Sequence, residues 1–241
     1  MVSNNVVFSN LVSNNLVSSN LVSNTPAARP LVLASGSPRR AELLQLLGRP
    51  FQVVLPQVPE QRTPSESAAA YVQRLAISKA EAGATLWRTK ATANTTTNSL
   101  VLGSDTVVVV GYAQAHEQVL EKPRDFADFQ RMMQLLSDTT HTVLTAVAVT
   151  QSAPLEPTTD VTMATMVATE VSFKPLSEGE IAAYWASGEP QDKAGGYGIQ
   201  GLAGRFVTHL QGSYFAVVGL PLYETAELLT RVETQQAGGQ Q

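Results

Sequence analysis

The stretch "LVLASGSPRRAELLQLLG", residues 31–48, predicts a buried strand that leads through a tight turn into a helix. The run "LVLA" has the length of a strand, and "RRAELLQLLG" has the apolar spacing of a helix that Gly48 would close. Ser37 is a good residue for the helix N-cap, and Pro38 suits the first helical position. A strand followed by a helix in this way is typical of α/β proteins.

Strands and helices continue to alternate along the rest of the chain. Because some strands follow one another without a helix between them, we expect an α/β fold with a mixed sheet. In the strand at 100–110, Gly-Ser-Asp is expected to break the run. The other expected elements are strands at 51–56, 141–151 and 165–177, helices at 63–87, 125–137, 178–188 and 222–232, loops at 88–99, 152–160 and 194–204, and a hairpin or two strands at 204–221.

The two ends of the chain differ from its middle. In residues 1–28 an Asn followed by an apolar residue recurs every five positions, which matches neither the helical nor the strand period. We therefore expect a low-complexity N-terminal tail at 1–28, a single folded domain at 29–233 and a flexible C-terminal tail at 234–241.

The composition excludes several classes of function. The 241 residues carry a net charge of −4, which argues against a bulk electrostatic grip on nucleic acid. With no cysteine and only three histidines, disulfides, thiolate chemistry and a His-rich metal site are not expected. The chain has no apolar run long enough to span a membrane and no basic residue before Arg29. A cytoplasmic protein is the expectation.

Arg39 and Arg40 fall in the first turn of the expected helix, where the helix dipole disfavours cations. Their position is reasonable if an anion binds there, because free backbone N–H groups at a helix start and guanidinium groups both suit phosphate. Ser37, Arg39 and Arg40 therefore predict a phosphate site. The alternative is a surface helix whose arginines face solvent.

Asp105 interrupts an apolar strand, where a carboxylate is costly unless it meets a cation, a metal or several donors. It is a candidate metal ligand or general base, and the alternative is a carboxylate that bonds its own backbone in a turn. Lys122 in "LEKPRD", Lys79 in the long helix and Glu60 before it are weaker candidates, since each alone is also a reasonable surface residue.

The loop "SGEPQDKAGGYGIQG", residues 187–201, contains five glycines, and such a loop lets backbone approach a ligand closely. Gln200 carries an amide that both donates and accepts, so it suits the edge of a nucleobase. Tyr197 suits stacking on a base or simple packing. Cations and carboxylates on several segments together suggest oxygen-ligated Mg²⁺ or Mn²⁺ and a phosphate substrate.

Six motifs occur together in the order found in one known family. They are "LVLASGSPRRAELLQLLG", "YVQRLAISKA", "LGSDTVVV", "EKPRD", "SGEPQDKAGGYGIQG" and "GSYFAVVGLPL", spread over about residues 30–232. In these motifs the chain resembles the Maf family of nucleoside triphosphate pyrophosphatases. The resemblance implies the Maf/Ham1 (inosine triphosphate pyrophosphatase-like) fold, with a mixed twisted sheet flanked by helices.

The resemblance also implies a function. "DKAGGYGIQG" is similar to the branch that hydrolyses dTTP and UTP to the monophosphate and pyrophosphate, with a divalent metal cation, in house-cleaning of the nucleotide pool. A homodimer is the family's expectation. The alternatives are the same hydrolysis of modified or purine nucleotides, and a nucleotide-binding regulator of cell division.

Individual roles follow from the resemblance position by position. It implies that Asp105 is catalytic and that Glu60 and Asp105 hold the metal. The remaining roles are base selection by Arg39, Thr106 and Gln200, and phosphate binding by Ser37, Arg40, Lys79 and Lys122. Two residues depart from the family's pattern: Pro59 stands where an acidic pair is common, and Asp138 stands where a glycine is usual.

Overall fold

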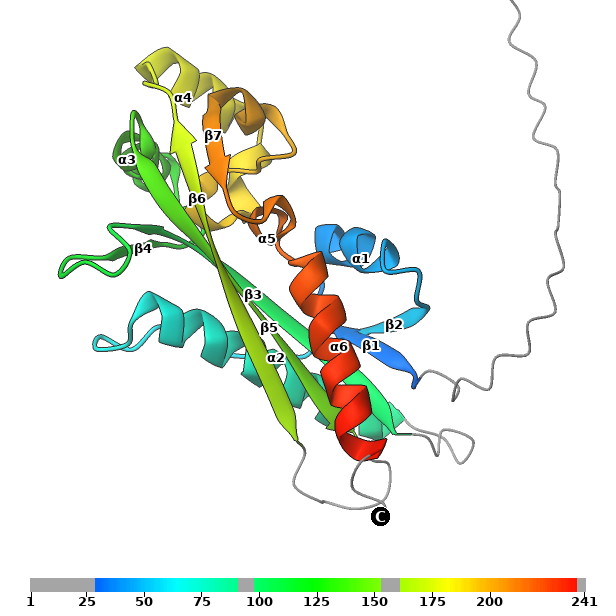
Figure 1. The fold of residues 1–241 in the computed structure, drawn as a ribbon. Coiled ribbons are helices and arrows are strands. Elements are labelled where there is room, and N and C mark those ends of the chain that lie inside the picture. Colours follow the sequence, from blue (N-terminus) through cyan, green and yellow to red (C-terminus); the bar gives the residue numbers. More distant parts are fainter. Residues whose placement is uncertain (1–28, 91–97, 153–160, 238–241) are drawn as a thin grey trace, which may run out of the picture.

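The computed structural model describes residues 29–90, 98–152 and 161–237, which form a seven-stranded mixed sheet (Figure 1). The strand order is β2-β1-β3-β5-β6-β7, and β4 pairs with β3 beside this path. β1 runs parallel to β2 and β3, whereas all other pairs are antiparallel. The strands are β1 (Leu31–Ala34), β2 (Phe51–Val54), β3 (Ser99–Val110), β4 (Gln118–Leu120), β5 (Thr140–Ser152), β6 (Thr162–Phe173) and β7 (Val207–Gln211).

Helices cover both faces of the sheet, so the predicted architecture of a mixed sheet flanked by helices is confirmed. The longest helix, α2, packs along one face, and α1 and α6 pack on the other. The helices are α1 (Pro38–Gln45), α2 (Ala68–Lys90), α3 (Phe126–Leu136), α4 (Glu178–Ala186), α5 (Tyr214–Val218) and α6 (Leu222–Ala237), with short 3₁₀ turns η1 (Glu189–Asp192), η2 (Ala194–Gly196) and η3 (Leu202–Phe206).

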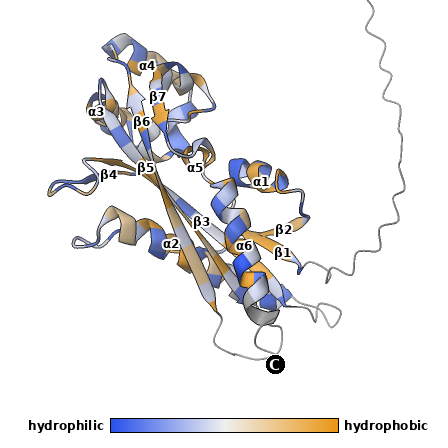
Figure 2. Cartoon of the chain, viewed as in Figure 1, coloured by the Kyte–Doolittle hydropathy of each residue, from blue (hydrophilic) through white to orange (hydrophobic). Residues whose placement is uncertain are grey.

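The alternation of side chains along β3 divides the core between the two faces. Val107 and Val109 pack with α2, whereas Leu100 and Leu102 pack with α1 and α6. In Figure 2 the strands β1 and β2 are coloured mainly as hydrophobic, whereas α6 mixes both colours, as expected of a helix with one face on the sheet. A further cluster beneath α3 and α4 fills the far end of the sheet.

The helix start predicted from the first motif is confirmed. Ser37 is the N-cap of α1 and its side chain accepts a hydrogen bond from the backbone N–H of Arg40, with Pro38 in the first turn. Gly48 lies just beyond the end of the helix at a φ of +67°, a backbone conformation that glycine adopts without strain.

Two predictions about local structure were wrong. Gly-Ser-Asp does not break the strand at 100–110, because β3 continues through all three residues and pairs with β5 from Ser99 to Val109. Residues 204–221 form no hairpin: β7 is the single strand there, and α5 follows it, with Ser213 as N-cap. The run "YFAVV" fits a strand and a helix equally well, and the cap decides between them.

The expected boundaries also shifted. The long helix begins at Ala68 and continues to Lys90, so part of the expected loop is helical. α6 continues to Ala237, past the expected domain end at 233. Asp138 adopts a φ of +54°, which explains why a glycine would fit this position. The expected tail at 1–28 and most of the loop at 152–160 lie outside the described residues.

Candidate active site

On one side of β3, residues 103–107 have no strand neighbour among the described residues. β1 pairs with β3 only as far as Leu102, and β4 pairs with it only from Val108 onward. We call this opening, residues 103–107, the notch. A cavity of about 920 Å³ lies at the notch, which is within the usual size of a small-molecule site. The notch exposes to this cavity a part of β3 that would otherwise be covered by a neighbouring strand.

Asp105 and Thr106 both line the cavity, from opposite faces of the strand. Successive side chains of a strand point to opposite faces, so Asp105 meets Lys79 of α2, whereas Thr106 meets Arg40 of α1. A ligand at the notch can therefore touch groups from both layers of helices.

Lys79 holds two carboxylates at the cavity. Its ammonium lies 2.6 Å from Oδ1 of Asp105 and 2.5 Å from Oε1 of Glu60. α2 comes close to β3 here because Gly103 has no side chain: a Cβ at Gly103 would collide with the backbone of Ala76 and Ala80. The close approach of helix and strand thus brings Lys79 within reach of Asp105.

Burial and charge act on the two carboxylates with different results. Burial raises the pKa of Asp105 above its ordinary value, although Lys79 and Arg40 oppose the change. For Glu60, burial alone would raise the pKa, but the hydrogen bond from Lys79 and the charges of Lys79 and Lys122 bring it below its ordinary value. The two pKa values thus shift in opposite directions, and the upward shift of Asp105 suits a group that takes up a proton.

Two further residues that line the cavity, Tyr71 and Glu121, were not found from the sequence. Tyr71 donates a hydrogen bond of 3.0 Å to Oε1 of Glu121, and its hydroxyl lies 3.0 Å from the backbone oxygen of Glu60. Burial and the Glu121 carboxylate raise the pKa of Tyr71, so its hydroxyl remains protonated. Glu121 stands beside Lys122 in "LEKPRD", but nothing in the spacing indicated that Tyr71 would meet it. The Lys122 ammonium lies 3.9 Å from Oε2 of Glu60, and the side chain of Lys122 is largely exposed.

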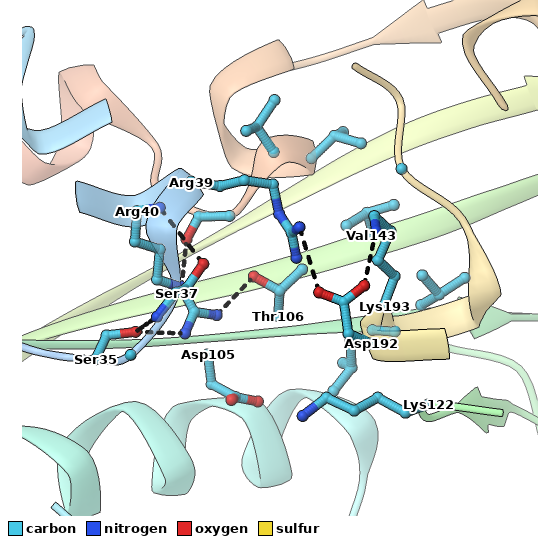
Figure 3. Close-up of a pocket in the computed structure, with 18 of the residues that line it drawn as sticks. Ser35, Ser37, Arg39, Arg40, Asp105, Thr106, Lys122, Val143, Asp192 and Lys193 are labelled. Carbon is cyan, nitrogen blue, oxygen red and sulfur yellow. Dashed lines mark hydrogen bonds and ion pairs between the residues drawn. The ribbon is translucent and has the colours of Figure 1, made fainter. Parts of the chain in front are cut away.

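The two arginines of the first motif have different surroundings (Figure 3). Arg40 donates through Nε to the backbone oxygen of Gly219, and through its two terminal nitrogens to Ser35 and Thr106. Burial lowers the pKa of Arg40, although the charges of Asp105 and Glu60 oppose the change. Arg39 points instead across the cavity toward Asp192, and its Nη1 lies 3.6 Å from Oδ2 of Asp192.

The glycine-rich loop forms the opposite wall of the cavity. Gln200 lines the cavity, is exposed, and makes no side-chain hydrogen bond to another described residue. Lys193 donates to Oδ1 of Asp192 at 2.7 Å, so Asp192 stands between two cations, Arg39 and Lys193. Tyr197 also borders the cavity, but it is only 6% exposed and bonds to His141, so its main role in this structure is packing.

All nine residues singled out from the sequence line this one cavity: Ser37, Arg39, Arg40, Glu60, Lys79, Asp105, Thr106, Lys122 and Gln200. They come from α1, α2, β3, the segments before α2 and after β4, and the glycine-rich loop. The structure thus brings together side chains that lie up to 163 positions apart, as Ser37 and Gln200 do.

The carboxylates at the cavity are too few to hold a divalent cation without ligands from outside the protein. Among the described residues no group of three or more His, Asp or Glu side chains is arranged to hold a metal ion. Glu60 and Asp105 supply two carboxylates, and Mg²⁺ is usually bound by one or two carboxylates together with phosphate oxygens and water. The pair therefore fits such an ion, with phosphate supplying the remaining ligands.

The comparisons with known proteins point to one family. The family model described as "Maf-like protein" matches residues 30–232. A dTTP/UTP pyrophosphatase of Vibrio cholerae is 56% identical over 199 residues, which are 83% of this chain and 96% of that protein. A dTTP/UTP pyrophosphatase of Pseudoalteromonas atlantica is 50% identical over 202 residues, 84% of this chain and 96% of that protein.

Similarity to solved structures is weaker. A nucleoside-triphosphatase (dITP/XTP pyrophosphatase) from Mycobacterium abscessus has 15% sequence identity and a TM-score of 0.37, covering 61% of this chain and 75% of that one. Within the described ranges, no helix is both long and apolar enough to cross a membrane. Since the family model covers most of the chain and the sequence relatives match over nearly their whole length, the chain belongs to the Maf-like protein family.

Proposed function

We propose that this protein is a nucleoside triphosphate pyrophosphatase that hydrolyses dTTP and UTP to the monophosphate and pyrophosphate. The observation that carries the proposal is the buried Asp105 at the notch, with a raised pKa and with Lys79, Lys122 and Arg39 around the same cavity. Relatives that are 50–56% identical and bear the name dTTP/UTP pyrophosphatase support the choice of substrate.

The phosphates are proposed to lie over the start of α1. The Ser37 hydroxyl and the backbone N–H of Arg39 in the first helical turn suit phosphate oxygens, and Lys79 and Lys122 add positive charge on the other side. Arg40 contributes through the donors that its bonds to Gly219, Ser35 and Thr106 leave free. Enzymes of phosphoryl transfer gain most of their rate from positioning the phosphates and stabilising their charge in this way.

Asp105 is proposed to act as the general base. Water attacks the α-phosphorus and forms a new P–O bond, its proton passes to Asp105, and the bond between the α-phosphorus and the bridging oxygen breaks to release pyrophosphate. Glu60 and Asp105 would hold a Mg²⁺ or Mn²⁺ ion, which supplies charge neutralisation on the phosphate oxygens when it is bound. Lys79 keeps both carboxylates at the same point before the substrate arrives.

The base is proposed to be read by Arg39, Thr106 and Gln200, which line the cavity on the side of α1 and the glycine-rich loop. We further propose a cytoplasmic enzyme that acts as a homodimer and does not use nucleic acid as a partner. The net charge of −4 supports the last point, because binding to the phosphate backbone of nucleic acid relies on basic residues.

The test is pyrophosphate release across all ribo- and deoxyribonucleoside triphosphates, with and without Mg²⁺ or Mn²⁺. UTP and dTTP are expected to be the best substrates, and Asp105→Asn is expected to lower kcat by about a hundredfold or more, as is typical of a lost general base. Asp125→Asn is a matched control, because Asp125 caps α3 away from the cavity and Asn also caps well. Preferential release from purine or modified nucleotides would favour the alternative substrates, and tight binding without release would favour a regulator.

A further inference from the structure

A chain of three oxygen atoms runs from the cavity into the core. The Thr106 and Thr145 hydroxyl oxygens lie 3.1 Å apart, and the Thr145 hydroxyl lies 2.7 Å from the backbone oxygen of Ala216. Thr106 and Thr145 face each other directly in the register of β3 and β5. Thr106 lines the cavity, whereas Thr145 is fully buried behind it.

The donor and the acceptor of each hydrogen bond in this row of oxygen atoms follow from its buried end, the Ala216 carbonyl. The Ala216 carbonyl can only accept, so the Thr145 hydroxyl must donate its one proton there. Thr145 then offers only lone pairs to its other neighbour, and Thr106 must donate its own proton to Thr145. Arg40, which has no acceptor, donates to the Thr106 oxygen from the far side at 3.4 Å.

Thr106 therefore has no proton left for a ligand. Toward the cavity it presents a lone pair alone, although a threonine hydroxyl is ordinarily free to rotate and either donate or accept. Gln200, on the opposite wall, has no such constraint, since its amide is exposed and not held by another described residue. Of these two groups, Thr106 is the one with a fixed direction.

We propose that Thr145 is a specificity-determining residue, because it makes Thr106 an obligatory acceptor and so selects pyrimidines that carry a proton on N3. The inference rests on the proposed function, in which the base lies against Thr106. Uracil and thymine carry an N3–H that Thr106 accepts. The N3 of cytosine is itself an acceptor, so it would meet the Thr106 lone pair with no proton between them.

A lone pair facing a lone pair in a desolvated site is strongly unfavourable, because both groups have lost their bonds to water. Gln200 can turn its amide to suit either the O4 of uracil or the amino group of cytosine, so it discriminates little by itself. The choice between the two bases thus depends on the proton of Thr106, which Thr145 controls without touching the substrate.

Thr145→Val tests this assignment, because valine has nearly the same shape and no hydroxyl. Thr106 then keeps its proton free and can donate it to cytosine, or rotate and accept from uracil. The ratio of kcat/KM for CTP over UTP is expected to rise at least tenfold, mainly through a gain on CTP, and dCTP over dTTP is expected to follow. Thr145→Ser, which retains the hydroxyl, is expected to keep the parent ratio.

The ratio separates this role from a structural one. Loss of packing or of the bond to Ala216 would lower the rates for both nucleotides together and would leave their ratio unchanged. Thermal unfolding checks that each variant is folded, and Thr145→Ala makes the same change in hydrogen bonding if valine is not accommodated. An unchanged ratio in a folded Val or Ala variant would overturn the inference. A parent enzyme that hydrolyses neither UTP nor dTTP would instead refute the proposed function.

Discussion

Lys79 donates a hydrogen bond of 2.6 Å to Asp105 across the narrow contact between α2 and β3. The same ammonium holds Glu60, so one cation lowers the pKa of both carboxylates against the effect of burial. This arrangement links the protonation of Asp105 to residues that can be changed one at a time, with opposite expected effects.

We expect the acid limb of kcat/KM to move in opposite directions in two variants. Burial raises the pKa of Asp105, Lys79 opposes this rise, and Glu60 adds to it. A general base works only when deprotonated, so Lys79→Met should move the limb to higher pH, and Glu60→Gln should move it to lower pH. The pH profile of kcat/KM for UTP measures both shifts. The nucleotide itself also titrates, but it does so equally for all variants and leaves the difference between them unchanged. Shifts in the same direction would refute Asp105 as the titrating base.

Glu189 is expected to set the affinity for the nucleotide. Its Oε1 accepts from the Tyr184 hydroxyl, which itself accepts from the backbone N–H of Gly198, and its Oε2 accepts from the backbone N–H of Leu202. Glu189 thus holds both sides of Gln200. Glu189→Ala should raise the KM for UTP about tenfold with little change in kcat, as for a lost binding contact. Steady-state kinetics measure this, with the exposed Glu178→Ala as control. A fall in kcat alone would contradict it.

His141 is expected to make the fold sensitive to acid. Its ring bonds to Tyr197 through Nε2, Nδ1 meets no partner among the described residues, and burial lowers the pKa of His141 to about 4. As the pH falls, His141 becomes protonated in the unfolded chain before it does in the folded protein. Between about pH 7.5 and 4, this one group should therefore remove about 3 kcal/mol from the free energy of unfolding. Urea titrations at several pH values measure the slope. In His141→Phe the slope should be smaller, and an equal slope would exclude this group as the cause.

Gly103→Ala should weaken both the fold and the activity. A Cβ there would lie against the carbonyl oxygen of Ala76 and 2.5 Å from the backbone nitrogen of Ala80, so α2 would have to move with Lys79. We expect a loss of about 1–3 kcal/mol in the free energy of unfolding, as for other overpacked sites. Gly179→Ala is the control, because a Cβ at Gly179 meets nothing within 4 Å. Equal unfolding curves for parent and Gly103→Ala would refute the close-contact argument.

Much of the site could be predicted from the sequence because its residues break local rules. Asp105 is a charge in an apolar strand, and Arg39 is a cation at the wrong end of a helix dipole, so each stands out without knowledge of the fold. Tyr71 and Thr145 could not be found in this way. A tyrosine in a helix and a threonine in a strand are unremarkable locally, and their roles arise only from partners 50 and 71 positions away.

The same distinction explains the errors in the fold. In the sequence Gly103 suggests a broken strand, whereas in the structure it is needed for the approach of α2, a tertiary contact that sequence spacing does not reveal. The run after β7 has no decisive period, and the cap at Ser213 sets it as a helix.

The position of Asp105 and Thr106 as neighbours on one strand has a consequence for how such enzymes diverge. Shifting β3 by a single residue would exchange the two side chains between the faces, so the proposed catalysis by Asp105 and the proposed base recognition by Thr106 would fail together. A single insertion or deletion in this strand is therefore expected to abolish both functions in one step. On the proposed function, replacements in the layer behind Thr106, such as Thr145, are expected to change the substrate preference while β3 stays where it is.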